Sequence, residues 1–314
     1  MTILTSRNYC EANDLQNMLA LLVAVRPADR ITDYPGLVDL HELLALGSVQ
    51  ANTRLWFNGE GRVVGFALVD PYHNLCFEID RPAAGPRIEA ELVAWGEACI
   101  RRAAVPEDHD PWSLDASCRA DDWQQISMLE RNGFVRQEVG SLHMTRALDV
   151  PIPAPQVPDG FLIRPVAGEQ EVQKLVDLHR AAFGSENMTV EERLAMMRVP
   201  EYDPELDLLA VGPDGRLGAV CMCSISREQN RRSGRNEGST DPVATHPDFQ
   251  RLGLARALLL TGLHKLKQRG IQTAVLGTSS ENTAMQRAAQ SVGFEVSATT
   301  LWFTKPVLKI PASV

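Results

Sequence analysis

Residues 242–255 read PVATHPDFQRLGLA, and the chain continues from Ala255 as ARALLLTGLHKL. The pattern predicts a short strand, a turn and a helix whose first turn carries no acidic residue. Gly253 removes side-chain bulk where consecutive amides open the helix, and such amides bind anions with help from the helix dipole. Arg251 and Arg256 add positive charge there. Taken alone, the Gly-x-Ala turn also fits an ordinary helix start, and it is neither a Gly-Lys-Ser/Thr phosphate loop nor a GxGxxG motif.

The longer stretch VATHPDFQRLGLARALLLTGLHKLKQRG, residues 243–270, resembles the acetyl-CoA motif of the GNAT N-acetyltransferase superfamily, Gln/Arg-x-x-Gly-x-Gly/Ala. Residues 277–294, GTSSENTAMQRAAQSVGF, are similar to the family's next motif, an Asn followed by Gly-Phe eleven and twelve positions later. The resemblance covers most of 161–305. It implies an N-acetyltransferase that transfers an acetyl group from acetyl-CoA to an amine of a small molecule, by direct attack in a ternary complex.

The resemblance also assigns the cofactor-binding positions. It implies that the amides of Arg251 to Arg256 hold the pyrophosphate, and that the backbone of Val243–Thr245 pairs with the pantetheine arm like an added strand. Asn282 is expected to touch that arm, to cap the helix that begins at Thr283, or to do both. The complete set of expected positions is Val243, Ala244, Thr245, Gln250, Arg251, Leu252, Gly253, Leu254, Ala255, Arg256 and Asn282.

Two positions depart from the family pattern. Ala289 stands where many members have a tyrosine that protonates the leaving thiolate, and Ser239 stands where many have a glutamate base. Asp241 and Glu237 share strand parity with Ser239, so both are candidates for the base, with Asp241 first. A solvated carboxylate at a strand end is the alternative for Asp241. Since Pro242 lacks an amide donor, the strand is expected to leave its partner or to bulge there.

The chain also reads as a duplication. Four prolines in Leu148–Gly160 predict a linker over 150–160 between domains 1–149 and 161–314. Each half has an early strand with an arginine, a Gly-centred hairpin and a helix stopped by Gly-Phe. These features repeat at Arg7 and Arg164, Gly61 and Gly215, and Gly133 and Gly293. The layout resembles that of the mycothiol synthase family, a match that implies no substrate.

We expect two tandem GNAT-like domains of mixed α/β class, an α+β mixed sheet in each, with a degenerate N-terminal copy. In that copy the segment FEIDRPAAGPRIEAEL, residues 77–92, has Gly85 but lacks the motif. Pro86 removes an amide, and Glu89 and Glu91 repel phosphate at the helix start. This domain is expected to shape the acceptor cleft or to stand in for a dimer partner, so the chain would be a monomer or a homodimer.

The second half offers four helical patterns and one basic stretch. The helices are expected at Glu169–Phe183, Glu191–Met197, Leu254–Arg269 and Thr283–Val292. Arginines 227, 231, 232 and 235 are expected in a loop before the strand, either solvated or in contact with an acidic acceptor or the nucleotide phosphate. His246, close to the phosphate seat, is expected to touch phosphate or to pack in its turn.

Charge and composition exclude several classes. With 31 basic and 40 acidic residues the net charge is −9, which opposes binding to nucleic acid and to anionic membranes. The N-terminal MTILTSRNYCEAND does not read as a signal peptide, and no apolar stretch approaches the ~20 residues of a membrane span. Six scattered cysteines without metal-site spacing predict buried thiols, no metal and a cytoplasmic location.

Two other functions remain open because both usual catalytic groups are missing. One is a non-catalytic module that binds or senses acyl-CoA, and the other is decarboxylation of an acyl-CoA on the same fold. Acetyl transfer at this site favours an acceptor of low basicity. An alkylammonium of pKa ~10.4 costs roughly 4.6 kcal/mol to deprotonate at pH 7, whereas an α-ammonium near pKa ~8 costs ~1.4 kcal/mol.

Overall fold

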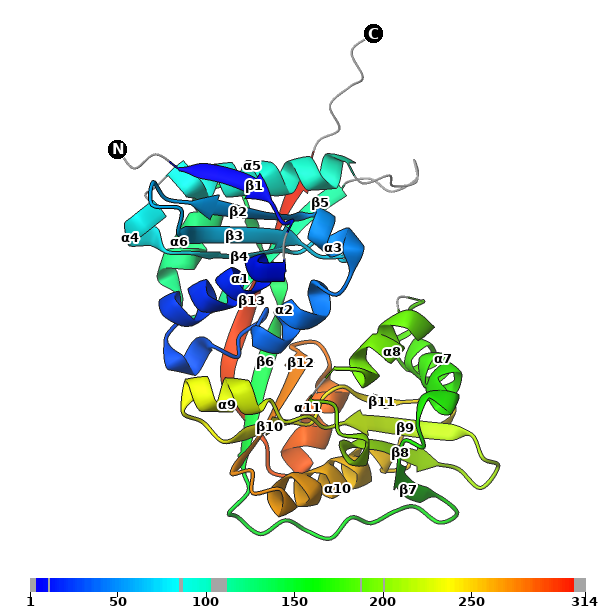
Figure 1. The fold of residues 1–314 in the computed structure, drawn as a ribbon. Helices are drawn as coiled ribbons and strands as arrows, with labels where there is room; N and C mark the ends of the chain where they lie inside the picture. The colour runs from blue at the N-terminus through cyan, green and yellow to red at the C-terminus, as the bar shows by residue number, and fades with distance from the viewer. Residues whose placement is uncertain are drawn as a thin grey trace. The chain divides into compact units, whose positions relative to one another are not determined.

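The computed structural model of the protein describes residues 4–10, 12–84, 87–102, 112–186, 188–199 and 201–307 (Figure 1). The chain forms two compact units. The first comprises Met1–Gly140 with Thr300–Val314, and the second comprises Ser141–Thr299. Among the described residues no helix is long and apolar enough to cross a membrane.

The first unit is built on a four-stranded antiparallel sheet. Its strands, in sheet order, are β1 (Thr5–Asn8), β2 (Thr53–Phe57), β3 (Val63–Val69) and β4 (Leu75–Ile79). Strand β5 (Trp112–Arg119) touches β4 through a parallel bridge between Asp115 and Asn74. The helices are α1 (Ala12–Val25), the 3-10 turn η1 (Ala28–Arg30), α2 (Leu37–Leu43), α3 (Gly47–Ala51), α4 (Arg81–Ala84), α5 (Arg87–Arg102) and α6 (Trp123–Arg131).

The second unit repeats this plan. Its four-stranded sheet has the order β11 (Val243–Thr245), β9 (Leu217–Met222), β8 (Asp207–Val211) and β7 (Leu162–Pro165). Strand β10 (Glu237–Ser239) pairs in parallel with β12 (Thr273–Ser279). The helices are α7 (Val172–Phe183), α8 (Val190–Met197), α9 (Arg227–Ser233), α10 (Leu254–Gln268) and α11 (Thr283–Ser291), with 3-10 turns η2 (Glu169–Glu171), η3 (Pro204–Leu206) and η4 (Pro247–Phe249).

A repeated ion pair supports the duplication. Arg7 binds Asp14 at 2.7 Å, and Arg164 binds Glu171 at 2.5 Å, each acid seven residues after its arginine. In both cases the carboxylate also accepts a backbone N–H four residues before it, from Cys10 in the first unit and from Ala167 in the second. The same polar contact therefore joins the first strand to the following helical segment in each unit.

The last strand of each half pairs inside the other unit. Residues 141–147 of β6 (Val135–Ala147) pair antiparallel with β12 in the second unit. Residues 300–307 of β13 (Glu295–Val307) pair antiparallel with β5 in the first unit. The compact units therefore differ from the halves 1–149 and 161–314 expected from the sequence, because the two terminal strands are exchanged.

The proline-rich stretch consequently belongs to the second unit and does not lie between the units. The Pro151 carbonyl accepts a hydrogen bond from Arg146 at 3.1 Å, and the Pro153 carbonyl lies 3.1 Å from Nε2 of His264 on α10. Its extended path, which the prolines favour, runs along the unit that contains α10.

Each exchanged strand brings a cation to the end of a helix. Lys305 of β13 donates to the carbonyl of Asn132, the C-cap of α6, at 2.7 Å. Arg146 of β6 is only 6% exposed and lies against Gly293, just after the C-cap of α11. A positive charge near a helix C-terminus is favourable, so both contacts help to hold the exchanged strands.

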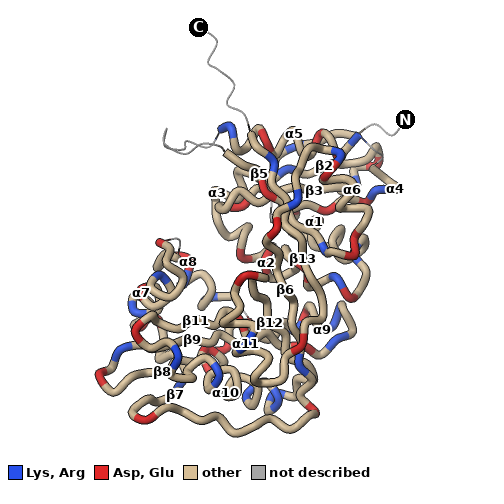
Figure 2. Tube along the Cα trace, turned by 180° about the vertical axis from the view of Figure 1, so that it is seen from behind, with Lys and Arg blue, Asp and Glu red and all other residues tan. Residues whose placement is uncertain are grey.

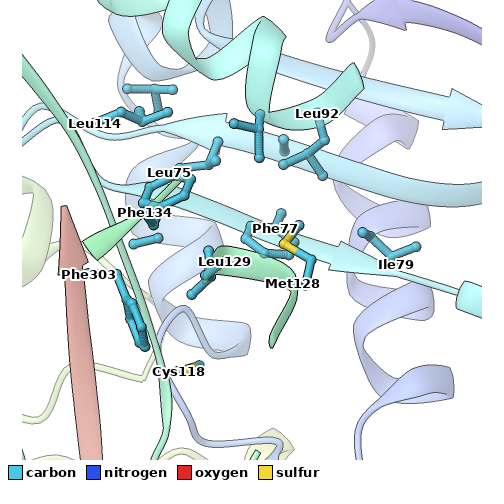
Figure 3. Packing of buried hydrophobic residues seen from close by; sticks show 14 of the residues in the cluster. Leu75, Phe77, Ile79, Leu92, Leu114, Cys118, Met128, Leu129, Phe134 and Phe303 are labelled. Atoms are coloured by element: carbon cyan, nitrogen blue, oxygen red, sulfur yellow. The ribbon is translucent and has the colours of Figure 1, made fainter. Parts of the chain in front are cut away.

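Buried apolar side chains fill each unit. In the first unit Leu114, Phe134 and Phe303 pack with residues of β4, α5 and α6 (Figure 3). Phe303 is fully buried there, although it belongs to β13. In the second unit the leucines of α10 pack on β8 and β9, where Gly262 comes close to Cys223.

Three of the four helices expected in the second half are present within one residue at each end, whereas α7 starts three residues later than expected, after the 3-10 turn η2. Thr189 and Glu192 form the capping box of α8, and Gly270 and Gly293 follow α10 and α11 with φ of +80° and +91°. The expected loop at 227–233 is instead the helix α9. Ser226 caps it by accepting the N–H of Gln229, and Gly234 ends it in a left-handed conformation.

Candidate functional site

The strand before α10 changes partner at Asp241–Pro242. Up to Ser239 it pairs in parallel with β12, and the N–H of Thr240 still donates to Val275 on β12 at 3.0 Å. From Val243 onward it pairs with β9. The expected departure at Pro242 is therefore confirmed, and strands β11 and β12 are not paired with each other.

Strand β11 presents unused backbone groups at its outer edge. Met222 donates to the carbonyl of Pro242 at 3.1 Å, and His246 donates to the carbonyl of Gly218 at 2.9 Å. Because alternate residues of an antiparallel strand face the partner, Val243 and Thr245 direct their N–H and C=O groups away from β9. An extended chain with amide groups, such as a pantetheine arm, can pair with that edge.

The loop between η4 and α10 presents a run of backbone amides. Arg251 and Gly253 have φ of +64° and +88°, a region that glycine adopts freely. Ala257 donates the first helical bond of α10, to the carbonyl of Gly253. Among the described residues, the amides of 251–256 donate no backbone hydrogen bond and meet no capping side chain. This arrangement fits a phosphate group, since an anion would satisfy these donors.

The charges around this loop favour an anion. The first turn of α10 has no acidic residue, and Arg251 is exposed while Arg256 is half-buried. Neither arginine forms an ion pair within the described part of the chain. Arg216 is instead held by Asp214 and Asp248 and lies over the ring of Phe249 at 4.5 Å.

The sequence predicted two roles for His246, contact with phosphate or packing in its turn, and the structure shows the packing. Its Nδ1 accepts the N–H of Asp248 at 3.2 Å, which caps η4, and its ring lies 5.7 Å from that of Phe249. Asn282 caps α11 by accepting the N–H of Met285 at 3.0 Å. The capping role of Asn282 is thus confirmed, and a contact with a cofactor stays a prediction.

Asp241 lies at the point where the strands part. Its Oδ2 accepts the N–H of Gly277 on β12 at 2.9 Å, and its Oδ1 accepts the hydroxyl of Ser239. Its own N–H donates to Oγ of Ser239 at 3.3 Å. The carboxylate is half-buried, with donors on both oxygens.

The second carboxylate that we considered, Glu237, is occupied elsewhere. Its side chain pairs with Arg235 at 2.9 Å and is 13% exposed, and its backbone pairs with Asn230. Burial alternates as expected, since Gly238 and Thr240 are buried whereas Glu237, Ser239 and Asp241 are half-buried. The structure thus brings Ser239 and Asp241 together and gives Glu237 a separate ion pair.

Ala289 on α11 is fully buried in the core of the second unit. A tyrosine at this position would need room that the packed helix does not offer in its present form. The position therefore supplies no acid, as its sequence indicates.

The basic stretch before β10 is largely neutralised. On α9, Arg231 and Arg232 pair with Glu228 at 3.7 and 2.7 Å. Figure 2 shows the basic positions of α9 together with acidic ones. Arg231 and Arg232 therefore form local surface pairs of small energetic value, and a contact of these arginines with an acceptor or a phosphate stays a prediction.

A buried polar cluster on the α7–α8 side escaped the sequence reasoning. Arg193 of α8, 6% exposed, pairs with Asp207 at the start of β8, and Tyr202 donates to the same carboxylate at 2.8 Å. Burial raises the pKa of Asp207, even though Arg193 lies beside it. Arg193 also contacts the sulfur of Met222 at 3.0 Å. Two features of the sequence could have indicated this cluster: Arg193 within the short helical pattern of α8, and Asp207 at the start of the buried strand β8.

His179 lies near this cluster on α7, the helix that packs on β9 and β11. Burial, and then the Arg193 charge, lower the pKa of His179. Its ring is therefore neutral at pH 7. The cluster fixes α8 against the sheet beside Met222, whose N–H bonds Pro242.

In the first unit the corresponding helix start is filled by side chains. Glu89 in the first turn of α5 pairs with Arg81 and, at 3.2 Å, with Arg131. Gly85 and Pro86 lie outside the described residues. Because Glu89 pairs with both arginines, their charge is not available to bind an anion at this helix start. This favours the interpretation that the first unit is a degenerate copy.

Among the described residues no group of three or more His, Cys, Asp or Glu side chains could hold a metal ion. The cysteines are reduced, and all but Cys10 are buried. The chemistry that the site offers is therefore that of backbone amides, a serine hydroxyl and a carboxylate.

Residues 172–294 match the acetyltransferase (GNAT) family. The chain also aligns with solved tandem structures over nearly its whole length. A GCN5-related N-acetyltransferase from Sphaerobacter thermophilus has a TM-score of 0.70 at 21% identity and covers 99% of this chain and 98% of its own. A tandem GNAT protein from the clavulanic acid biosynthesis pathway has a TM-score of 0.68 at 17% identity, with full coverage of both chains.

Curated relatives carry the name mycothiol acetyltransferase. That of Nocardia farcinica is 28% identical over 87% of this chain and 88% of its own length. That of Saccharomonospora viridis is 24% identical over 88% of this chain and 96% of its own length. That of Cellulomonas flavigena is 31% identical, but the match spans only 53% of this chain and half of the relative.

An acetyltransferase (GNAT) domain is therefore recognised at 172–294, and these relatives and solved structures support a tandem GNAT layout and an N-acetyltransferase. GNAT acetyltransferases, including those named mycothiol acetyltransferase, use acetyl-CoA as co-substrate.

Proposed function

We propose that the second unit binds one acetyl-CoA per chain and transfers its acetyl group to an amine of a small molecule. The observation that carries the proposal is the run of unpaired amides at 251–256, continuous with the outward-facing edge of β11. The amides fit the pyrophosphate, and Val243 and Thr245 fit the pantetheine arm. The first unit, whose helix start is filled by Glu89, binds no acetyl-CoA.

The amine attacks the thioester directly while both substrates are bound. Attack requires the neutral amine, so a proton must leave the ammonium before or during the step. Asp241 is the proposed acceptor of that proton, because it lies where β11 and β12 part. General-base catalysis of this kind is typically worth ~10²–10⁴-fold in rate.

The leaving thiol needs less help. A thiol of ordinary pKa about 8.5 leaves as thiolate near neutral pH, so the alanine at 289 weakens turnover without preventing it. Since the usual acid and base are both replaced, we propose an acceptor amine of lowered basicity, such as an α-amine or an amino sugar. The relatives named mycothiol acetyltransferase support a small-molecule acceptor.

The test is a screen of primary amines against acetyl-CoA, with release of free CoA thiol and formation of the N-acetyl product both measured. Stoichiometric thiol and product would support the proposal. Tight binding of acetyl-CoA without release from any amine would favour a non-catalytic binding module, and CO₂ from malonyl-CoA would favour decarboxylation. The absence of both usual catalytic groups is the observation behind these two alternatives.

A further inference from the structure

Ser239 occupies the position of the usual glutamate, and its side chain contacts Asp241. The hydroxyl donates to Oδ1 of Asp241, and Oγ accepts the N–H of Asp241 at 3.3 Å. A hydroxyl oxygen has two lone pairs, so Oγ can accept one further hydrogen bond while it donates its own proton.

The two carboxylate oxygens of Asp241 face different donors. Oδ2 of Asp241 faces the N–H of Gly277 on β12, whereas Oδ1 faces Ser239. Glu237 is held by Arg235 and does not compete for the role. Ser239 is also the last residue in register with β12, two positions before Asp241, where the strand changes partner.

We propose that Ser239 relays the proton of the acceptor ammonium to Asp241, so that the two residues together replace the missing glutamate. As the amine attacks, its N–H bond breaks and an O–H bond forms at Oγ of Ser239. The original hydroxyl proton of Ser239 passes at the same time to Oδ1 of Asp241. No charge is left on the serine, and Asp241 ends the step as a neutral acid that returns its proton to water. The relay rests on the proposed amine acetylation.

A purely structural role makes a different prediction. If Ser239 only holds the corner between β10 and β11, its hydroxyl could be lost with some loss of stability but with no change in the number of protons that move in the rate-limiting step.

The experiment compares wild type with Ser239→Ala, Asp241→Asn and the double variant. Thiol release from acetyl-CoA is followed with D-glucosamine and with glycinamide as probe amines, and with water alone as the acceptor. Ser291→Ala, whose hydroxyl bonds the Ala288 carbonyl on α11, is the matched serine control. Acetyl-CoA affinity is measured for each variant, so that kcat effects are separated from binding and folding.

The relay predicts that Ser239→Ala and Asp241→Asn each lower kcat by about 10²–10³-fold, within the range of general-base catalysis. The double variant should be no slower than either single variant, because both act in one pathway. For wild type, a plot of kcat against the fraction of D₂O should be curved, because two protons move in the same step. A second change, Ser239→Glu, should restore activity to Asp241→Asn.

A Ser239→Ala rate within twofold of wild type, or losses that multiply in the double variant, would overturn the relay and leave the amine acetylation intact. A wild-type protein that binds acetyl-CoA but releases no thiol to any amine of the screen would instead remove the proposed function, and the relay with it.

Discussion

The carboxylate of Asp241 accepts the backbone N–H of Gly277 at 2.9 Å, and this bond joins the two strands at the place where they part. A carboxylate there is anchored to β12, while the backbone that follows it belongs to the sheet of β9. Its position is therefore fixed from both sides, which a proton acceptor in acyl transfer requires.

Replacing Asp241 with Asn keeps the shape of the side chain and removes its ability to take a proton. We expect kcat to fall by ~10²–10³-fold at pH 7. The defect should shrink as pH approaches the pKa of the acceptor amine, since free base then becomes abundant. The measurement is kcat from pH 6 to 9, with acetyl-CoA affinity measured in parallel and expected to change little.

Asp214→Asn is the matched control, because Asp214 is exposed and pairs only locally with Arg216 in the hairpin loop. Its rates should follow those of wild type. Equal rates for Asp241→Asn and wild type across this pH range would show that Asp241 is only a strand-end carboxylate.

The strand exchange predicts which fragment folds. A fragment cut after the proline-rich stretch, 161–314, lacks residues 141–147 and leaves one edge of β12 unpaired. It also lacks Met144 and Leu148, both buried in the core of the second unit, each worth ~2–5 kcal/mol. We expect fragment 141–299 to unfold cooperatively and to bind acetyl-CoA, and fragment 161–314 to do neither, by circular dichroism and calorimetry. Equal binding by both fragments would show that β6 is dispensable to this unit.

That exchange could not be read from the sequence. The alternating patterns at 135–147 and 295–307 predict strands, but alternation specifies which face is buried and not which strand is the partner.

The helix α10 and its preceding turn were predictable, because Gly253, the leucine spacing and the absence of acids act locally. The contact between Ser239 and Asp241 was not, because it depends on where the strand leaves β12. The helix α9 was missed although Ser226 and Gly234 are ordinary signals of a helix start and end.

Glu42 on α2 makes the stability of the first unit depend on pH. Burial, with Asp39 nearby, raises its pKa to about 7. A carboxyl with a raised folded pKa binds its proton more tightly in the folded state, so this contribution is fully present below about pH 4.5 and is lost as pH rises through 7. Glu42→Gln should therefore match wild type near pH 4.5 and be more stable at pH 8, by ~1–3 kcal/mol.

Urea unfolding at the two pH values measures this difference. Glu60→Gln, in the exposed turn between β2 and β3, is the control and should not change the pH dependence. If the free energy of unfolding of Glu42→Gln differed from that of wild type by the same amount at both pH values, Glu42 would not be the source of the pH dependence.

Titration calorimetry of acetyl-CoA into wild type and Gly253→Glu tests the central claim most directly. Gly253 has φ of +88° and open space beside it, so a glutamate there is strained and places a carboxylate at the amide run. Gly61→Glu carries the same strain at φ +76°, with open space beside it, in the β2–β3 hairpin of the first unit and is the matched control. We predict one site per chain in wild type and in Gly61→Glu, and affinity at least 100-fold weaker in Gly253→Glu. Two equivalent sites, or unchanged affinity in Gly253→Glu, would contradict the placement of acetyl-CoA at the start of α10.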